Sequence, residues 1–247
     1  FLGAGRYSLL RELGRGGYGI VHLARDSTLQ RNVAIKHLAK SSRLPHGKVL
    51  TEQLHREAMA VAALNHPNIV QVYDFLDDEN GCYIVMEYMP GGTLGDLLDG
   101  TEPLKMPDEE ILSFFDQIGG ALKAAHSNGL VHRDVKPSNI LLTQTSPRIP
   151  KLADFGIVAG YGPTATGETQ GRAGTPLYMA PEQLESASGP VTPAADIYSF
   201  GKVIYECLTG EIGLAIDGEH RRLSPGVGRV IRKAVASDPK SRHGTVV

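Results

Sequence analysis

The segment Leu130–Leu142, LVHRDVKPSNILL, places charged and polar residues inside a run that is otherwise apolar. Arg133, Asp134, Lys136 and Asn139 all lie between its apolar flanks. Burying a charged group costs free energy unless the group is paired or used. The segment therefore predicts a site that receives a partner molecule.

The order of the elements around this segment predicts strands first and helices later. Loose alternation predicts a strand over 7–13, and short β-branched runs bounded by turn residues predict strands over 20–24, 32–38, 69–75 and 82–88. Apolar residues spaced three or four apart predict helices over 46–64, 107–129, 192–210 and 226–237. Such an order is typical of an α+β fold, so we expect a β-rich lobe followed by a mainly α-helical one.

Cap residues, proline and glycine bear on two of the predicted helices. Thr192 is expected to cap a helix whose first turn holds Pro193, and the apolar middle of that helix predicts burial. Gly119 and Gly120 fall inside the helix 107–129, where glycine costs about 1 kcal/mol per residue relative to alanine. Close packing of another helix at these glycines is the expected compensation.

Composition excludes several broad classes of protein. The chain has 247 residues, 41% of them hydrophobic and 21% charged, with a formal net charge of −2. This balance argues against a general affinity for nucleic acid or an anionic membrane. No apolar run reaches the length of a membrane span, and no signal peptide is visible.

Cysteine usage and the first residue bear on the setting of the chain. Cys82 and Cys207 are far apart and are the only cysteines, which predicts a reducing cytosolic compartment rather than a disulfide scaffold. Because the sequence starts at Phe1 rather than Met, we expect it to be a piece of a longer protein.

The glycine-rich run GRGGYG, with Gly14, Gly16 and Gly19, admits three interpretations. It can be a structural hairpin turn, or a dinucleotide fingerprint, which requires a helix directly afterwards. Another strand is expected instead. The third interpretation is a loop between strands whose backbone N–H groups approach phosphates without obstruction by side chains.

Two opposite charges are expected to point inward near this loop. Lys36 lies on a strand with apolar neighbours, and Glu57 lies on the apolar face of the helix 46–64. Lys36 can be an edge lysine that faces water. The alternative is an ion pair with Glu57 that holds the lysine towards phosphates.

Asp134, Asn139 and Asp154 together suggest an all-oxygen site. Mg²⁺ takes one or two carboxylates and completes its shell with phosphates and water. One carboxylate can instead orient a hydroxyl nucleophile, in chemistry that depends on positioning and charge neutralisation.

With these residues the chain resembles the eukaryotic-type serine/threonine protein kinase family. The resemblance covers nearly the whole chain and is carried, in the family's order, by GRGGYGIV, VAIK, REAMAVAALNHPNIV, HRDVKPSN, DFG, GTPLYMAPE, DIYSFG and DPKSR. It implies a two-lobed fold, with an N-lobe over 1–86, a hinge over 87–93 and a C-lobe over 94–247.

The resemblance also implies the residues that bind ATP. Gly14, Gly16 and Gly19 would cover the phosphates, and Lys36 would bind the α- and β-phosphates while paired with Glu57.

Adenine would be held by a second set of residues. Val21 and Ala34 would lie above the ring and Leu141 below it. Met86 would be the gatekeeper, and the backbone of the hinge residues Glu87 to Met89 would bond adenine.

For catalysis, the resemblance implies that Asp134 is the base and that Asn139 and Asp154 bind Mg²⁺. Lys136 marks a serine/threonine-specific enzyme, and Thr175 would support Asp134 and Lys136. The expected activity is transfer of the ATP γ-phosphate to Ser or Thr hydroxyls of protein substrates. Alternatives are a pseudokinase that acts as a binding module or scaffold, and a small-molecule kinase of related fold.

Several further roles follow from the same resemblance. His132 would be structural and stacked with Phe155, and Glu182 would pair with Arg242.

The resemblance also implies regulation. Arg133 would receive a phosphorylated activation loop, with candidate sites at Thr164, Thr166 and Thr169. Thr169 is favoured by its distance from the GTP motif, and the alternative is that these threonines only make the loop soluble. The segment DIYSFGKVIYECLTGE, residues 196–211, is similar to bacterial members, whose kinase domain is often tethered to a membrane on the inside of the cell. Pairing of two chains through the β-rich lobe stays open.

Overall fold

The computed structural model describes residues 2–16, 19–39, 47–98, 102–106, 108–155, 177–184, 191–212 and 222–246. They form two compact units. Unit 1 holds the described residues up to 65 and residues 70–89, and unit 2 holds residues 66–69 and the described residues from 90 onwards. Among these residues, no helix has both the length and the apolar character needed to cross a bilayer.

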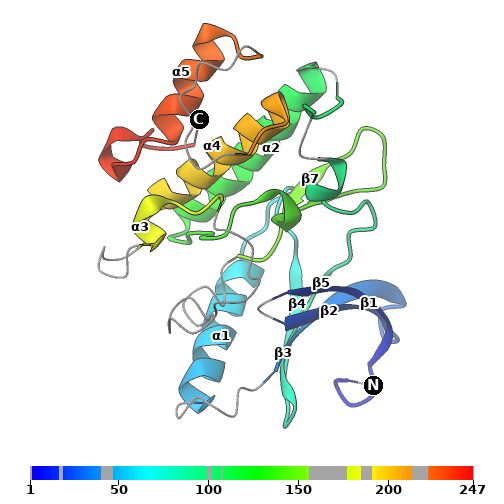
Figure 1. Cartoon of the computed structure of the whole chain (residues 1–247). Coiled ribbons are helices and arrows are strands. Elements are labelled where there is room, and N and C mark those ends of the chain that lie inside the picture. The colour runs from blue at the N-terminus through cyan, green and yellow to red at the C-terminus, as the bar shows by residue number, and fades with distance from the viewer. Residues whose placement is uncertain are drawn as a thin grey trace. The chain divides into compact units, whose positions relative to one another are not determined.

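Unit 1 is built on a five-stranded antiparallel sheet with the strand order β1-β2-β3-β5-β4 (Figure 1). Its strands are β1 (Tyr7–Gly16), β2 (Gly19–Asp26), β3 (Arg31–Ala39), β4 (Val72–Asp77) and β5 (Gly81–Glu87). Its helix α1 (Gly47–Ala62) contacts β4. The expected β-rich lobe is confirmed.

The two faces of this sheet carry different side chains. One face holds a buried apolar cluster of Tyr7, Ala24, Val33, Ile35, Tyr83 and Val85. Because successive side chains of a strand alternate between faces, the residues between these belong to the other face. Val21 lies opposite Lys36, and Ala34 lies opposite Met86, so the predicted nucleotide residues share this second face.

The carboxylate of Asp26, the last residue of β2, is fully buried at one end of the sheet. The guanidinium of Arg6 donates to both oxygens of Asp26, through Nε at 3.0 Å and Nη2 at 2.8 Å. The backbone N–H groups of Thr28 and Leu29 also donate to Asp26. The hydrogen bond from Arg6 and these backbone bonds lower the pKa of Asp26 from 3.8 to about 2.

This pKa predicts a defined pH dependence of unfolding. A carboxyl group with a depressed folded-state pKa stabilises the fold above its unfolded pKa, and this contribution is lost as the pH falls through the folded value. We expect the difference in free energy of unfolding between wild type and Asp26→Asn to stay constant above pH 3.8 and to shrink between pH 3.8 and about pH 2. Urea unfolding at a series of pH values measures this difference. A difference that does not change over that window contradicts the assignment.

Unit 2 is mainly helical. Its longer helices are α2 (Asp108–Ser127), α4 (Pro193–Thr209) and α5 (Pro225–Ala234), with α2 and α4 side by side (Figure 1). Its shorter elements are the helix α3 (Pro181–Leu184), the 3₁₀ turns η1 (Gly95–Leu97), η2 (Pro137–Asn139) and η4 (Pro239–Ser241), and the hairpin β6 (Ile140–Leu142) and β7 (Pro150–Leu152). This arrangement confirms the expected α-rich second lobe.

Glycines allow the helices of unit 2 to approach closely. A Cβ atom at Gly119 on α2 would lie 3.1 Å from Val246 and 3.8 Å from Phe200 of α4. At Gly201 on α4 it would lie 2.9 Å from the Cβ of Ala234 on α5. The close neighbour of Gly119 is thus Val246, which lies outside the helices, and a Cβ at Gly120 would come no closer than 3.8 Å to His66, so the close helix packing expected at these two glycines is found at Gly201 instead.

Two local expectations differ from the structure. Thr192 does precede α4, but its side chain makes no capping hydrogen bond. Of the two expected signals for the start of this helix, only Pro193 in the first turn is therefore found to act. The strand expected to start at residue 69 starts at Val72. Ile69 instead forms a parallel bridge with Leu152, because its apolar side chain is buried in unit 2 rather than in the sheet of unit 1.

An ion pair buried in unit 2 ties α3 to the end of the chain. Arg242 donates to both carboxylate oxygens of Glu182 at 2.7 Å, as the resemblance implied. The same guanidinium donates to the carbonyl oxygens of Ala194, Ala236 and Ser237. Every N–H group of the Arg242 guanidinium therefore has a hydrogen-bond acceptor, which compensates the cost of burying its charge.

Removing this guanidinium should be costly. Arg242→Met leaves the carboxylate of Glu182 and three carbonyl oxygens without their donor, so we expect a loss of about 3–5 kcal/mol in the free energy of unfolding. Arg229→Met, on the exposed side of α5, is the matched control and should stay within about 0.5 kcal/mol of wild type. Chemical denaturation compares the two. Equal stabilities of the two variants would show that the pair contributes nothing.

Candidate active site

The segment between α2 and β6 is held by a buried carboxylate on α4. Asp196 is 1% exposed and accepts hydrogen bonds from the backbone N–H groups of His132 at 2.7 Å and Arg133 at 2.8 Å. The Nε2 atom of His126 on α2 lies 2.8 Å from the same carboxylate. Asp196 was not predicted as a site residue, although an acid inside an apolar helix is a signal that the sequence offers.

Backbone strain accompanies this anchoring. Arg133 and Asp154 have φ values of 67° and 58°, in the left-handed region that residues other than glycine rarely adopt. Such conformations cost about 1–3 kcal/mol each and persist where the surroundings enforce them. The ring of His132 packs against that of Phe155 with the centroids 4.6 Å apart and the planes tilted by 42° rather than stacked, and its Nε2 lies 2.9 Å from the carbonyl oxygen of Ala153. His132 therefore has the structural role that was expected.

Among the described residues, Asp134 has hydrogen-bond partners at one of its two carboxylate oxygens. Its Oδ2 accepts hydrogen bonds from Lys136 Nζ at 2.8 Å and from Asn139 Nδ2 at 2.9 Å. Its Oδ1 makes no hydrogen bond to any residue that the structure describes. The side chain is 24% exposed, so a hydroxyl group from outside can reach it. A carboxylate oriented in this way suits a proton acceptor.

The amide of Asn139 is oriented by the same contacts. Its Nδ2 donates to both the side chain and the backbone carbonyl of Asp134, so its Oδ1 is directed away from that carboxylate. The backbone N–H of Ala153 donates to the carbonyl oxygen of Asn139, which places the following residue, Asp154, beside this turn. An amide oxygen and a carboxylate are donors that fit Mg²⁺, although the described residues contain no group of three or more His, Cys, Asp or Glu suited to a metal.

In unit 1, the strand register lines up the predicted phosphate-binding residues. Gly14 lies opposite Val21, and Val21 lies opposite Lys36, which is 9% exposed. Glu57 is half-buried on α1. The ion pair between Lys36 and Glu57 stays a prediction.

The glycines of the first hairpin separate into two kinds. Gly19 has φ 136°, and a Cβ there would lie 2.1 Å from the carbonyl oxygen of His37, so the backbone itself requires glycine. A Cβ at Gly14 or Gly16 would meet no described atom within 4 Å. Their missing side chains leave open space above the sheet, which favours the interpretation as a phosphate loop over that as a structural turn. The strand β2 follows, so the helix needed by a dinucleotide fingerprint is absent from the part described here.

The remaining predicted residues are distributed between the units. Ala34, Met86, Glu87 and Met89 belong to unit 1, and Leu141 lies on β6 in unit 2. Thr175 and the threonines 164, 166 and 169 lie outside the described residues.

Comparison with known proteins identifies the family. A model of the protein kinase domain matches residues 7–243. The chain belongs to the protein kinase family. Similar relatives of this kinase domain are the serine/threonine-protein kinases PrkC of Bacillus subtilis, 37% identical over 98% of the chain, and PknB of Mycobacterium leprae, 38% identical over 97%. The chain spans 39% and 41% of the lengths of these relatives.

Solved kinase structures share the fold. The kinase domain of Mycobacterium tuberculosis PknI has a TM-score of 0.76 and 27% identity, over 98% of this kinase domain and 92% of that chain. Rad53 in complex with AMP-PNP has a TM-score of 0.75 and 28% identity, over 96% of this chain and 62% of that one. The expected two-lobed kinase fold is therefore confirmed, and so is the expected likeness to bacterial members of the family.

Proposed function

We propose that this kinase domain transfers the γ-phosphoryl group of ATP to serine and threonine hydroxyls of protein substrates, with Asp134 as the base and Mg²⁺ as the metal. The observation that carries the proposal is the orientation of Asp134, whose Oδ2 is fixed by Lys136 and Asn139 while its Oδ1 bonds to none of the described residues. Lys36 and the glycines of the first hairpin are assigned to the phosphates.

In this mechanism, Asp134 accepts the proton of the hydroxyl as the hydroxyl oxygen attacks the γ-phosphorus. The bond between that phosphorus and the bridging β–γ oxygen breaks, and ADP leaves with the electron pair. Lys136 keeps the carboxylate in place through its 2.8 Å hydrogen bond and adds positive charge beside the transferred group. Mg²⁺ held by Asn139 and Asp154 would neutralise phosphate charge.

The direct test is transfer of labelled γ-phosphate from ATP to a generic protein and to the domain itself. Labelled phosphoserine or phosphothreonine in the product supports the proposal. Binding of ATP without any transfer would favour the pseudokinase alternative, and transfer only to small molecules would favour a small-molecule kinase.

We also propose autophosphorylation at Thr169, which would dock on Arg133. The Nε atom of Arg133 is buried and makes no hydrogen bond to any described residue, so the guanidinium retains donor capacity for a phosphate. Incubation with ATP and Mg²⁺ is expected to add phosphate at Thr169 and to raise activity, and Thr169→Ala should prevent the rise. Mass spectrometry that finds no phosphate between residues 160 and 175 of active enzyme would end this idea.

A further inference from the structure

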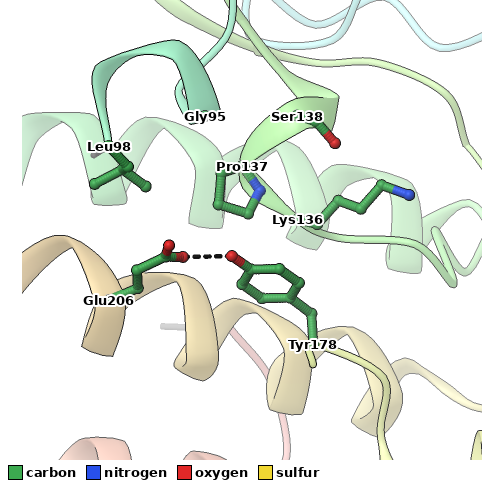
Figure 2. Close-up of a pocket in the computed structure, with 7 residues that line it drawn as sticks. All are labelled: Gly95, Leu98, Lys136, Pro137, Ser138, Tyr178 and Glu206. Carbon is green, nitrogen blue, oxygen red and sulfur yellow. Dashed lines mark hydrogen bonds between the residues drawn. The ribbon is translucent and has the colours of Figure 1, made fainter. Parts of the chain in front are cut away.

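A pocket of about 330 Å³ lies beside the proposed base, entirely within unit 2. Its lining residues come from the turns η1 and η2, the segment before α3 and the helix α4 (Figure 2): Gly95, Leu98, Lys136, Pro137, Ser138, Tyr178 and Glu206. Lys136 joins this pocket to Asp134, with which it is hydrogen-bonded. A side chain bound here would therefore belong to a residue close to the phosphorylated hydroxyl.

Glu206 is the acidic group of the pocket and is 6% exposed. One of its oxygens accepts a hydrogen bond from the Tyr178 hydroxyl, and the other points into the pocket (Figure 2). That second oxygen makes no hydrogen bond to any described residue. By itself, such a carboxylate would favour a cationic side chain.

The charge of Glu206 is balanced from within the protein. Lys202 lies four residues earlier on α4, on the same face of the helix, and is 3% exposed. Burial lowers the pKa of Lys202, while attraction to Glu206 opposes that change. Burial raises the pKa of Glu206, while the bond from Tyr178 and the charge of Lys202 oppose it. The charge of Glu206 at the pocket is thus coupled to that of the buried Lys202.

A cation entering the pocket would meet both of these charges, and it would also meet the ammonium group of Lys136, which is already paired with Asp134. The attraction of the cation to Glu206 would be offset by repulsion from Lys202, so little would remain to compensate the loss of its hydration. An uncharged N–H donor can use the available oxygen of Glu206 at a smaller desolvation cost. The apolar walls formed by Leu98 and Pro137 suit the aliphatic part of such a side chain.

We propose that Lys202 determines substrate choice at this pocket: by balancing Glu206, it makes the pocket select an uncharged hydrogen-bond donor, such as the amide of glutamine, over arginine or lysine. Lys202 acts through Glu206 and is a positioning residue, not a catalytic one. The inference rests on the proposed function, because the selected side chain is that of a protein substrate.

The test uses peptides that hold one acceptor serine and differ at a single position, which carries glutamine, arginine or glutamate and is scanned on both sides of the serine. At the position that fills the pocket, wild type should show a higher kcat/KM with glutamine than with arginine. Lys202→Met should reverse this ratio to favour arginine by about tenfold, because the carboxylate is then unbalanced. Lys202→Arg keeps the charge and should keep the wild-type ratio.

Glu206→Gln gives an independent test. The positive charge of Lys202 is then no longer balanced by Glu206, so the preference should shift to the glutamate peptide. The double variant Lys202→Met/Glu206→Gln should show no preference by charge. Ratios between peptides do not depend on the fraction of folded enzyme, so a loss of stability does not obscure them. Wild type that prefers arginine, or a Lys202→Met ratio equal to that of wild type, overturns the inference.

Binding separates this inference from the proposed activity. Peptides with alanine in place of the acceptor serine report the same preferences as dissociation constants, without any phosphate transfer. Preferences that follow Lys202 and Glu206 in binding support the inference even if no transfer occurs, and binding that ignores both substitutions refutes it even in an active enzyme.

Discussion

Asp134→Asn is expected to lower kcat for phosphate transfer by about 10²–10⁴, the range for a positioned acid–base group. Asparagine preserves the shape of the side chain and can still accept hydrogen bonds from Lys136 and Asn139. It cannot take up the hydroxyl proton. Transfer of labelled γ-phosphate measures the loss, and titration with a fluorescent ATP analogue should show unchanged nucleotide affinity.

Asp116→Asn provides the control for this variant. Asp116 is an exposed carboxylate on α2, in the same unit, so its replacement removes one negative charge without touching the site. It should retain wild-type kcat. If Asp134→Asn turned over as fast as Asp116→Asn, Asp134 would not be the base.

Asp154→Ala should abolish both activity and its dependence on Mg²⁺. Asp154 is the carboxylate of the proposed metal pair, and charge stabilisation by a bound metal is worth several kcal/mol, so we expect a loss of at least about 10³-fold in kcat/KM. Calorimetric titration with ATP gives a second readout. Mg²⁺ should tighten nucleotide binding to wild type and leave binding to the variant unchanged.

Two outcomes would count against this assignment. Retained Mg²⁺-dependent tightening in Asp154→Ala would place the metal on other residues. Wild type that shows neither Mg²⁺-dependent binding nor activity would fit a pseudokinase, and the comparison with Asp154→Ala would then show no change.

Local sequence patterns predicted most of the architecture because the fold follows them closely. Short runs with β-branched residues predicted the strands of unit 1 except β1, which was predicted from loose alternation alone. Leu54, Ala58 and Val61 are the buried face of α1, as their spacing indicated. Ile69 was wrongly predicted to belong to the strand that becomes β4. An apolar run does not reveal whether its side chains are buried in unit 1 or in unit 2. Thr192 shows that a residue type favourable for capping does not ensure the hydrogen bond.

The chemistry of the site was predictable where its residues are close in sequence. Asp134, Lys136 and Asn139 lie within a single turn, and their mutual bonds follow from that proximity. The support from Asp196 was missed because more than sixty residues separate it from His132. Lys202 and Glu206 have helical spacing, but their burial beneath a pocket depends on how α4 packs in three dimensions.

The bonds from His132 and Arg133 to Asp196 have a consequence for how the proposed active site is lost on heating. Loops usually open locally, long before a domain melts. Here the backbone next to Asp134 is hydrogen-bonded to Asp196 on the buried helix α4. We therefore expect this backbone to unfold together with that helix. Loss of catalytic competence and loss of the native helical lobe should therefore occur in one transition.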